Sequence, residues 1–255
     1  MAEVIDRAAT VPDVELAHVR YPSNGYDVPA FLARPLGSGP SPGVIVGQEA
    51  FGLTDHIEDV AANLAREGYV ALAPDYYART GGPTPREDVP AIMAAVDRID
   101  NPTVAGDFLN AVAYLVDRGL AAPERVGTIG FCTGGTYSML LAIEKPDLAC
   151  AVLFYVSQLT YPELNERKPY HPIDRAGDIR CPTLVIYGDE DPVGTPERLA
   201  RLEDNLKKGS VPYEFKLYAG ANHAFLNPDA WLYHEEAARQ AWPDALRYLA
   251  RYLKG

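Results

Sequence analysis

Short apolar segments alternate with helical patterns along most of this chain, and this alternation constrains its fold more than any other feature. The segments are rich in Val, Ile and Leu, and five of them cover residues 44–46, 70–73, 126–131, 149–156 and 183–187. A strand that is apolar along its whole length is typical of a parallel sheet covered by helices on both faces. We therefore predict an α/β protein whose central sheet is mostly parallel.

The segments between these strands show the spacing of amphipathic helices. In the first of them Ile57, Val60 and Leu64 recur at intervals of three and four residues, which places them on one helical face. By the same criterion we expect six helices and one further strand. The helices are expected near residues 55–67, 86–98, 103–118, 136–144, 196–207 and 235–253, and the strand at 213–218.

Two segments depart from the alternating pattern. Residues 14–21 and 28–34 read as strands on either side of a turn at residues 23–25, so they predict a hairpin that adds an antiparallel edge to the sheet. Residues 157–178 are polar and aperiodic. A loop of that length is usually functional, and we expect it to form a rim or a lid over a site.

The composition argues against several classes of protein. The net charge is −12 and no basic run occurs, whereas nucleic-acid binding draws on clustered Lys and Arg. No stretch approaches the roughly 18 consecutive apolar residues of a membrane-spanning helix, and the first ten residues do not resemble a signal peptide. Three cysteines without a C-x-x-C pattern do not suggest a disulfide framework. We expect one domain over residues 1–255, in the cytoplasm.

The most informative motif is Gly-Phe-Cys-Thr-Gly-Gly at residues 130–135. It lies between a predicted strand and a predicted helix, and it matches the G-x-S-x-G nucleophile elbow with Cys132 in place of serine. The helix N-terminus there favours a thiolate, and the Thr133 N–H can donate to an oxyanion. The alternative is that Cys132 is a small buried apolar residue, which is how we interpret Cys150 and Cys181.

A nucleophile on such an elbow needs an acid and then a histidine later in the chain. Asp191 lies in the turn after the predicted strand at residues 183–187, and we prefer it to its two acidic neighbours. His223 lies on a short loop after the last predicted strand, from which it can reach the elbow. The alternative for Asp191 is a turn-forming or helix-capping role. The sequence thus predicts a triad of Cys132, His223 and Asp191.

Five motifs in this order resemble the dienelactone hydrolase family of α/β-hydrolases, from about residue 14 to the C-terminus. They are Gln-Glu-Ala-Phe-Gly at residues 48–52, Pro-Asp-Tyr-Tyr-Ala-Arg at residues 74–79, the cysteine elbow, the Asp191 turn and Asn-His-Ala-Phe at residues 222–225. The resemblance implies the α/β-hydrolase fold and the hydrolysis of lactones or carboxylic esters. It implies no metal ion and no organic cofactor.

The resemblance also implies a role for each member of the site. Cys132 would be the nucleophile, His223 the general base and Asp191 the residue that fixes the imidazole tautomer. The N–H groups of Thr133 and Ala50 would form the oxyanion hole.

The family also has a glutamate near the nucleophile, and Glu49 matches it. It would interact with the resting thiol and help to activate it when substrate arrives. Its negative charge would also raise the pKa of the thiol, which could keep the resting nucleophile protonated. The alternative is that Glu49 is an ordinary loop or helix-start acid.

Arg79 matches a family arginine that binds the substrate carboxylate through paired hydrogen bonds; a surface salt bridge is the alternative. The founding enzymes have a second arginine four positions after the catalytic histidine. Here that position is Asn227, so half of the carboxylate clamp is missing, and Arg239 and Arg167 are the candidates to replace it.

Phe51, Tyr155 and Asn227 complete the predicted substrate-binding residues, although Tyr155 could equally be a core tyrosine. We predict that Cys132 forms a thioester with a dienelactone (4-carboxymethylenebut-2-en-4-olide), a related enol-lactone or another ester. A broad carboxylesterase, a binding or thiol-redox protein, and an acyl transferase are the alternatives. The expected partner is a small ester or lactone, anionic if Arg79 binds it, and no oligomeric state is predicted.

Overall fold

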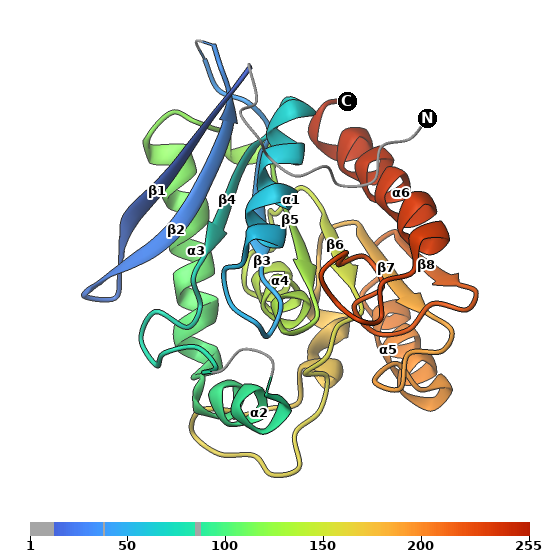
Figure 1. The fold of residues 1–255 in the computed structure, drawn as a ribbon. Coiled ribbons are helices and arrows are strands. Elements are labelled where there is room, and N and C mark those ends of the chain that lie inside the picture. The colour runs from blue at the N-terminus through green and yellow to red at the C-terminus, as the bar shows by residue number, and fades with distance from the viewer. Residues whose placement is uncertain (1–12, 38, 85–87) are drawn as a thin grey trace.

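A single eight-stranded sheet organises the computed structural model, which describes residues 13–37, 39–84 and 88–255 (Figure 1). The strand order is β1-β2-β4-β3-β5-β6-β7-β8. The strands are β1 (Val14–Ser23), β2 (Tyr26–Pro35), β3 (Gly43–Gly47), β4 (Val70–Pro74), β5 (Val126–Phe131), β6 (Ala151–Phe154), β7 (Thr183–Gly188) and β8 (Tyr213–Tyr218).

The sheet is parallel from β4 to β8 and antiparallel only where the hairpin joins it. β1 pairs with β2, and β2 pairs with β4, both in antiparallel register, whereas all other neighbouring strands run parallel. Strands β3 to β7 are buried along their whole length, but β8 is half-exposed because it forms the edge. The predicted α/β class, the mostly parallel sheet and the antiparallel hairpin edge are therefore confirmed.

Helices cover both faces of the sheet. Helices α1 and α6 lie on one face, and α3 and α4, which contact each other, lie on the opposite face (Figure 1). The helices are α1 (Asp55–Arg66), α2 (Val89–Arg98), α3 (Asn101–Asp117), α4 (Thr133–Glu144), α5 (Pro196–Lys208) and α6 (Glu235–Leu253), with 3₁₀ turns at Pro123–Arg125 and Pro172–Asp178. No helix in these ranges is long and apolar enough to cross a bilayer.

Three of the boundaries that differ from the prediction have a clear local reason. Helix α4 begins at Thr133 instead of residue 136, because the elbow turns directly into the helix. Helix α3 begins two residues early, since the Asp100 side chain caps it by accepting the N–H of Thr103. Strand β6 is shorter than residues 149–156, and the backbone leaves the sheet at Tyr155, whose φ is 34°.

Two further segments agree with the prediction only in part. The start of the helix expected at 86–98 lies partly outside the described residues, and α2 itself begins after an Asp88 cap that accepts the N–H of Ala91. The predicted loop at 157–178 is irregular over most of its length but ends in a 3₁₀ turn.

The parallel arrangement brings the chemical motifs to one edge of the sheet. Glu49 follows β3, Cys132 follows β5, Asp191 follows β7 and His223 follows β8. Because parallel strands all end at the same edge, four segments far apart in sequence meet there. This carboxyl edge is where the candidate site lies.

Candidate active site

The turn between β5 and α4 holds Cys132 in an unusual backbone conformation. Its φ is 54° and its ψ is −119°, which a residue with a side chain adopts only when the surroundings enforce it. A Cβ on Gly130 would lie 2.3 Å from the carbonyl oxygen of Gly134, and one on Gly134 would lie 2.2 Å from the carbonyl carbon of Gly47. Only glycines permit this contact, so the motif forces β3, β5 and α4 together beneath the cysteine.

The structure brings the three predicted triad residues together in the expected order. The Cys132 Sγ lies 3.2 Å from Nε2 of His223, and Nδ1 of His223 lies 2.9 Å from Oδ2 of Asp191. The second oxygen of the Asp191 carboxylate accepts the N–H of Val193 at 2.8 Å. The Asp191 side chain has no exposed surface, so its charge acts on the imidazole without screening by water.

The thiol and the imidazole shift each other's ionisation. Burial alone would raise the pKa of the Cys132 thiol, but the charge and hydrogen bond of His223 outweigh burial and lower it below its ordinary value. Burial alone would lower the pKa of His223, but the Cys132 thiolate and the Asp191 carboxylate raise it. Both shifts favour a thiolate–imidazolium pair.

Thr133 and Ala50, the two predicted oxyanion donors, both line the cavity that contains Cys132. Thr133 is the first residue of α4, where backbone N–H groups have no acceptor within the helix. The loop that carries Ala50 is fixed by two tyrosines. Tyr76 donates to the carbonyl of Glu49 at 2.8 Å, and Tyr77 donates to the carbonyl of Ala50 at 2.9 Å.

Glu49 is completely buried behind the nucleophile, and two neutral side chains hold its carboxylate. The Tyr155 hydroxyl donates to Oε1 at 3.2 Å, and the Asn227 amide donates to Oε2 at 2.5 Å. Burial raises the pKa of Glu49 to about 7, against the opposing effects of the Asn227 hydrogen bond and the His223 charge. Its charge raises the pKa of Cys132, as expected, but the imidazole effect is larger.

Two of the three predicted pocket residues direct their polar groups to Glu49. Neither Tyr155 nor Asn227 lines the cavity that contains Cys132, and the polar groups of both side chains face Glu49. The Tyr155 ring also packs edge-on against the His223 imidazole, with 5.3 Å between their centroids. Phe51 alone among the three lines the cavity.

Arg79 and its two predicted substitutes lie away from the cavity. The Arg79 guanidinium donates twice to the Asp107 carboxylate, at 2.8 and 3.1 Å, and once to the carbonyl of Ser23. It therefore ties the β1–β2 hairpin to α3, which is the salt-bridge alternative. Arg239 pairs with Glu236 on α6, and Arg167 is exposed, and neither of them lines the cavity.

The cavity around Cys132 has a volume of about 650 Å³. Helix α2 and residues 157–162 form much of its wall, so the start of the predicted rim segment does line the site. Its apolar wall includes Phe51, Ile92, Met93, Val96, Pro162 and Leu232. Sequence reasoning missed α2 as a wall, because its apolar residues fit a core helix equally well.

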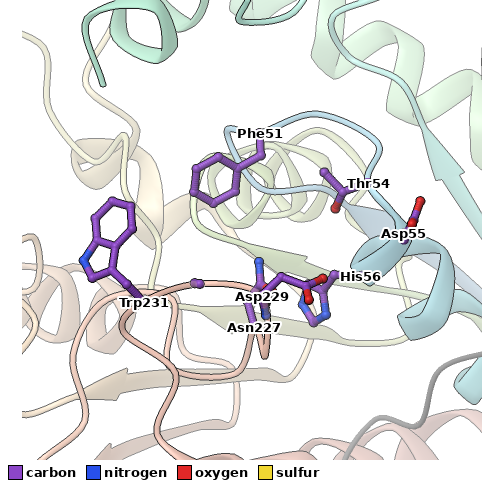
Figure 2. A pocket seen from close by; sticks show the side chains of 8 residues that line it. Phe51, Thr54, Asp55, His56, Asn227, Asp229 and Trp231 are labelled. Carbon is purple, nitrogen blue, oxygen red and sulfur yellow. Dashed lines mark hydrogen bonds between the residues drawn. The ribbon is translucent and has the colours of Figure 1, made fainter. Parts of the chain in front are cut away.

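A second cavity of about 370 Å³ adjoins the first and shares Phe51 and Trp231 with it. In the view of Figure 2 Trp231 lies to the left of Phe51, and the side chains of Asn227, Asp229 and His56, which also line this cavity, are drawn below Phe51. The His56 imidazole is buried, and burial lowers its pKa to about 4. Asn227 lines this second cavity and its amide donates to Glu49, so it lies between the two.

In residues 13–37, 39–84 and 88–255, no group of three or more His, Cys, Asp or Glu side chains could hold a metal ion. The chemistry that the arrangement supports is nucleophilic attack by a thiolate next to an imidazole, with backbone N–H groups for the resulting oxyanion.

Comparison with known proteins gives consistent results. The sequence model of the dienelactone hydrolase family matches residues 28–253. A Salmonella typhimurium protein provisionally named carboxymethylenebutenolidase is 36% identical over 233 residues, which cover 91% of this chain and 85% of that protein. A Bradyrhizobium protein named a probable 2-oxo-3-(5-oxofuran-2-ylidene)propanoate lactonase is also 36% identical, with coverage of 91% and 93%.

A solved structure supports the same relationship. The Klebsiella pneumoniae protein, provisionally described as a dienelactone hydrolase, superimposes with a TM-score of 0.87 at 33% sequence identity. The alignment covers 94% of this chain and 99% of the other.

Proposed function

The chain belongs to the dienelactone hydrolase family of lactone and ester hydrolases, and we propose that Cys132 is its nucleophile and a thioester its intermediate. The observation that carries this proposal is the distance of 3.2 Å between the Cys132 Sγ and Nε2 of His223, at the end of a chain of contacts that begins at Asp191. The shifted ionisation of both groups supports it, because a thiolate is the reactive form of cysteine.

In the first stage the Cys132 thiolate attacks the carbonyl carbon of the ester or lactone. The carbonyl oxygen becomes an oxyanion that accepts hydrogen bonds from the N–H groups of Thr133 and Ala50. When the tetrahedral intermediate collapses, the C–O bond breaks and the leaving oxygen takes the proton of the His223 imidazolium. The acyl group then remains on Cys132 as a thioester, and in a lactone it still carries the leaving oxygen.

In the second stage a water molecule gives one proton to neutral His223 and attacks the thioester carbonyl. The C–S bond breaks, the carboxylic acid is released, and the thiolate is restored beside the imidazolium. A thiolate is itself a good leaving group, so the first intermediate expels poor leaving groups such as amines inefficiently. The site therefore suits enol-lactones and activated esters better than peptides.

We infer that Glu49 is a second proton acceptor close to the nucleophile. Its pKa of about 7 lets it exchange a proton near neutral pH. Its hydrogen-bond partners Tyr155 and Asn227 carry no positive charge that would hold it permanently ionised. When Glu49 is ionised its charge opposes the thiolate, and when it is protonated this opposition disappears. Glu49 would thus adjust the thiolate population beside His223.

For the substrate we propose an enol-lactone. The name of the Bradyrhizobium relative describes a lactone with an exocyclic double bond and a carboxylate. An enolate leaves readily, as the thiolate mechanism requires. The apolar wall of the cavity fits a small unsaturated ring.

A substrate panel tests the proposed function. Wild-type protein and the Cys132→Ala variant would be assayed on dienelactone isomers, phenyl acetate and other aryl esters. We expect the wild type to hydrolyse dienelactones or aryl esters and the variant to lose at least about a thousandfold in kcat/KM. Undiminished hydrolysis by pure Cys132→Ala protein would contradict the proposed nucleophile, and good ester turnover without dienelactone turnover would contradict the proposed substrate.

A further inference from the structure

The catalytic cavity contains a cation that the sequence motifs do not indicate. Arg198 lies in the first turn of α5 and lines this cavity, and it is the only arginine or lysine among the described lining residues. Its side chain is exposed, so its guanidinium can reach a ligand at the mouth of the cavity.

The guanidinium of Arg198 keeps most of its hydrogen-bonding capacity. One of its groups, Nη1, donates to the carbonyl of Val193 at 3.2 Å. Arg198 forms no salt bridge within the part of the chain that the structure describes, whereas Arg79 donates two hydrogen bonds to the Asp107 carboxylate. A guanidinium has five N–H donors, so a fork remains for an incoming carboxylate.

The same turn that carries the triad acid also places Arg198. From Asp191 the chain passes through Val193 to Thr195, whose hydroxyl caps α5 by accepting the N–H of Arg198 at 3.4 Å. The backbone of Arg198 is thus fixed relative to Asp191, and Arg198 and His223 line one cavity. A group bound by Arg198 would lie near the reacting atoms.

The charges along the cavity wall give a bound ligand an orientation. The other charged residue that lines the cavity outside the triad is Asp97 on α2, which also lies close to the Lys168 ammonium. Helix α2 follows β4 and α5 follows β7, and three strands separate these two in the sheet. Figure 1 shows α2 and α5 on different sides of the carboxyl edge. An anion is therefore attracted toward α5 and repelled from α2.

We propose that Arg198 binds the carboxylate of an anionic ester or lactone at the mouth of the catalytic cavity. This rests on the proposed function, because it identifies the substrate class of the same site. Arg198 would supply the carboxylate recognition that the sequence suggested for Arg79. It would act in substrate binding and leave the chemistry to Cys132 and His223.

Kinetics on two matched esters test the proposal. The first is 4-acetoxybenzoate, which carries a carboxylate on its leaving group, and the second is the neutral 4-acetoxybenzamide. We expect Arg198→Gln to raise the KM for the anionic ester about five- to tenfold, since a charge-assisted but exposed pair is lost. The KM for the amide should stay within about twofold of the wild-type value, because the amide forms no such pair.

Arg201→Gln is the matched control. Arg201 lies one turn further along α5, is exposed, pairs with Asp174 and does not line the cavity. The Arg201→Gln substitution removes the same charge from the same helix, and we expect it to leave both KM values unchanged. Added salt should raise the wild-type KM for the anionic ester and have little effect on the KM of Arg198→Gln.

Each outcome separates this proposal from the proposed function. If the wild type hydrolyses both esters but Arg198→Gln changes neither KM, or raises both equally, the carboxylate site is wrong and the hydrolase function stands. If neither ester is hydrolysed, calorimetric titration of 4-acetoxybenzoate into Cys132→Ala protein, with and without Arg198→Gln, measures binding directly. A five- to tenfold weaker Kd in the double variant supports the site by the same charge-pair argument, and equal Kd values overturn it.

Discussion

The two buried carboxylates of the site are held in different ways. Asp191 is fixed by its own turn, where its carboxylate accepts backbone N–H groups, and it faces His223. Glu49 is fixed by side chains that lie 106 and 178 residues away, those of Tyr155 and Asn227. The Asp191 carboxylate is held within its own turn and pairs with an imidazole. The Glu49 carboxylate is held by neutral donors from distant segments, and burial raises its pKa to about 7. From this difference we propose that Asp191 orients the imidazole and that Glu49 titrates.

The largest effect is expected at the orienting acid. Asp191→Asn keeps the size of the side chain but removes the charge and can present an N–H to the imidazole, which favours the wrong tautomer. We expect kcat/KM to fall by about a thousandfold or more. The measurement is steady-state kinetics on phenyl acetate, with thermal melting to verify folding. A fall of less than tenfold in a folded variant would show that Asp191 does not orient His223.

Glu49 should make the free energy of unfolding depend on pH. The pKa of Glu49 rises from 4.5 unfolded to about 7 folded, so the folded state binds this proton more tightly. The contribution of the protonated Glu49 carboxyl to the free energy of unfolding is fully present below pH 4.5 and is lost as the pH rises through 7. The total is roughly 3 kcal/mol of unfolding free energy. Glu49→Gln should therefore gain stability over wild type by that amount between pH 4.5 and pH 8.

Urea unfolding at several pH values measures this gain. The exposed Glu190, in the Asp191 turn, supplies the control, and Glu190→Gln should follow the wild-type pH dependence. If wild type and Glu49→Gln lost stability in parallel over this range, Glu49 would not be a titrating group.

The fold and the proximity of Cys132, His223 and Asp191 could be predicted because both depend on local patterns. Apolar strands indicate a parallel sheet, parallel strands share a carboxyl edge, and the motifs after them must meet there. The cysteine elbow has the added constraint of its glycines, which no other residue can replace. Cys132, Asp191 and His223 could therefore be expected to meet before their distances were known.

The surroundings of the triad could not be predicted in the same way. The partners of Glu49 and Arg79 come from distant segments, and no local pattern specifies which way a polar side chain on a loop points. Asn227 was expected to face substrate but turns to Glu49, and Arg79 turns to Asp107. Arg198 has no motif, since its place at the cavity follows from the length of the turn after Asp191.

A smaller effect is expected when the amide that holds Glu49 is removed. The Asn227 hydrogen bond lowers the pKa of Glu49 against the effect of burial. Asn227→Ala should therefore raise the pKa of Glu49 by about one unit, which is the effect of one charge-assisted hydrogen bond, and should move the pH transition of stability in urea unfolding upward by the same amount. An unchanged pH transition would mean that Asn227 does not control the ionisation of Glu49.

The smallest effect is expected from Tyr155→Phe. The Tyr155 hydroxyl also favours the charged form of Glu49. It lowers the pKa of Glu49 less than Asn227 does, and its hydrogen bond is longer, at 3.2 Å. The upward shift of the same pH transition of stability should be about half a unit or less. Tyr187→Phe is the control, because its buried hydroxyl donates to the carbonyl of Val156 and not to Glu49. A larger shift in Tyr155→Phe than in Asn227→Ala would reverse the ranking.

We propose that Cys132 carries the acyl group during turnover, and trapping of the intermediate tests this directly. Wild-type protein mixed with excess phenyl acetate and quenched in acid within milliseconds should show, by intact mass spectrometry, a fraction with one added acetyl group. Peptide mapping should place that group on Cys132, and it should disappear as substrate is exhausted. An acetyl group that maps to another residue, or full turnover by the Cys132→Ala variant, would contradict the account.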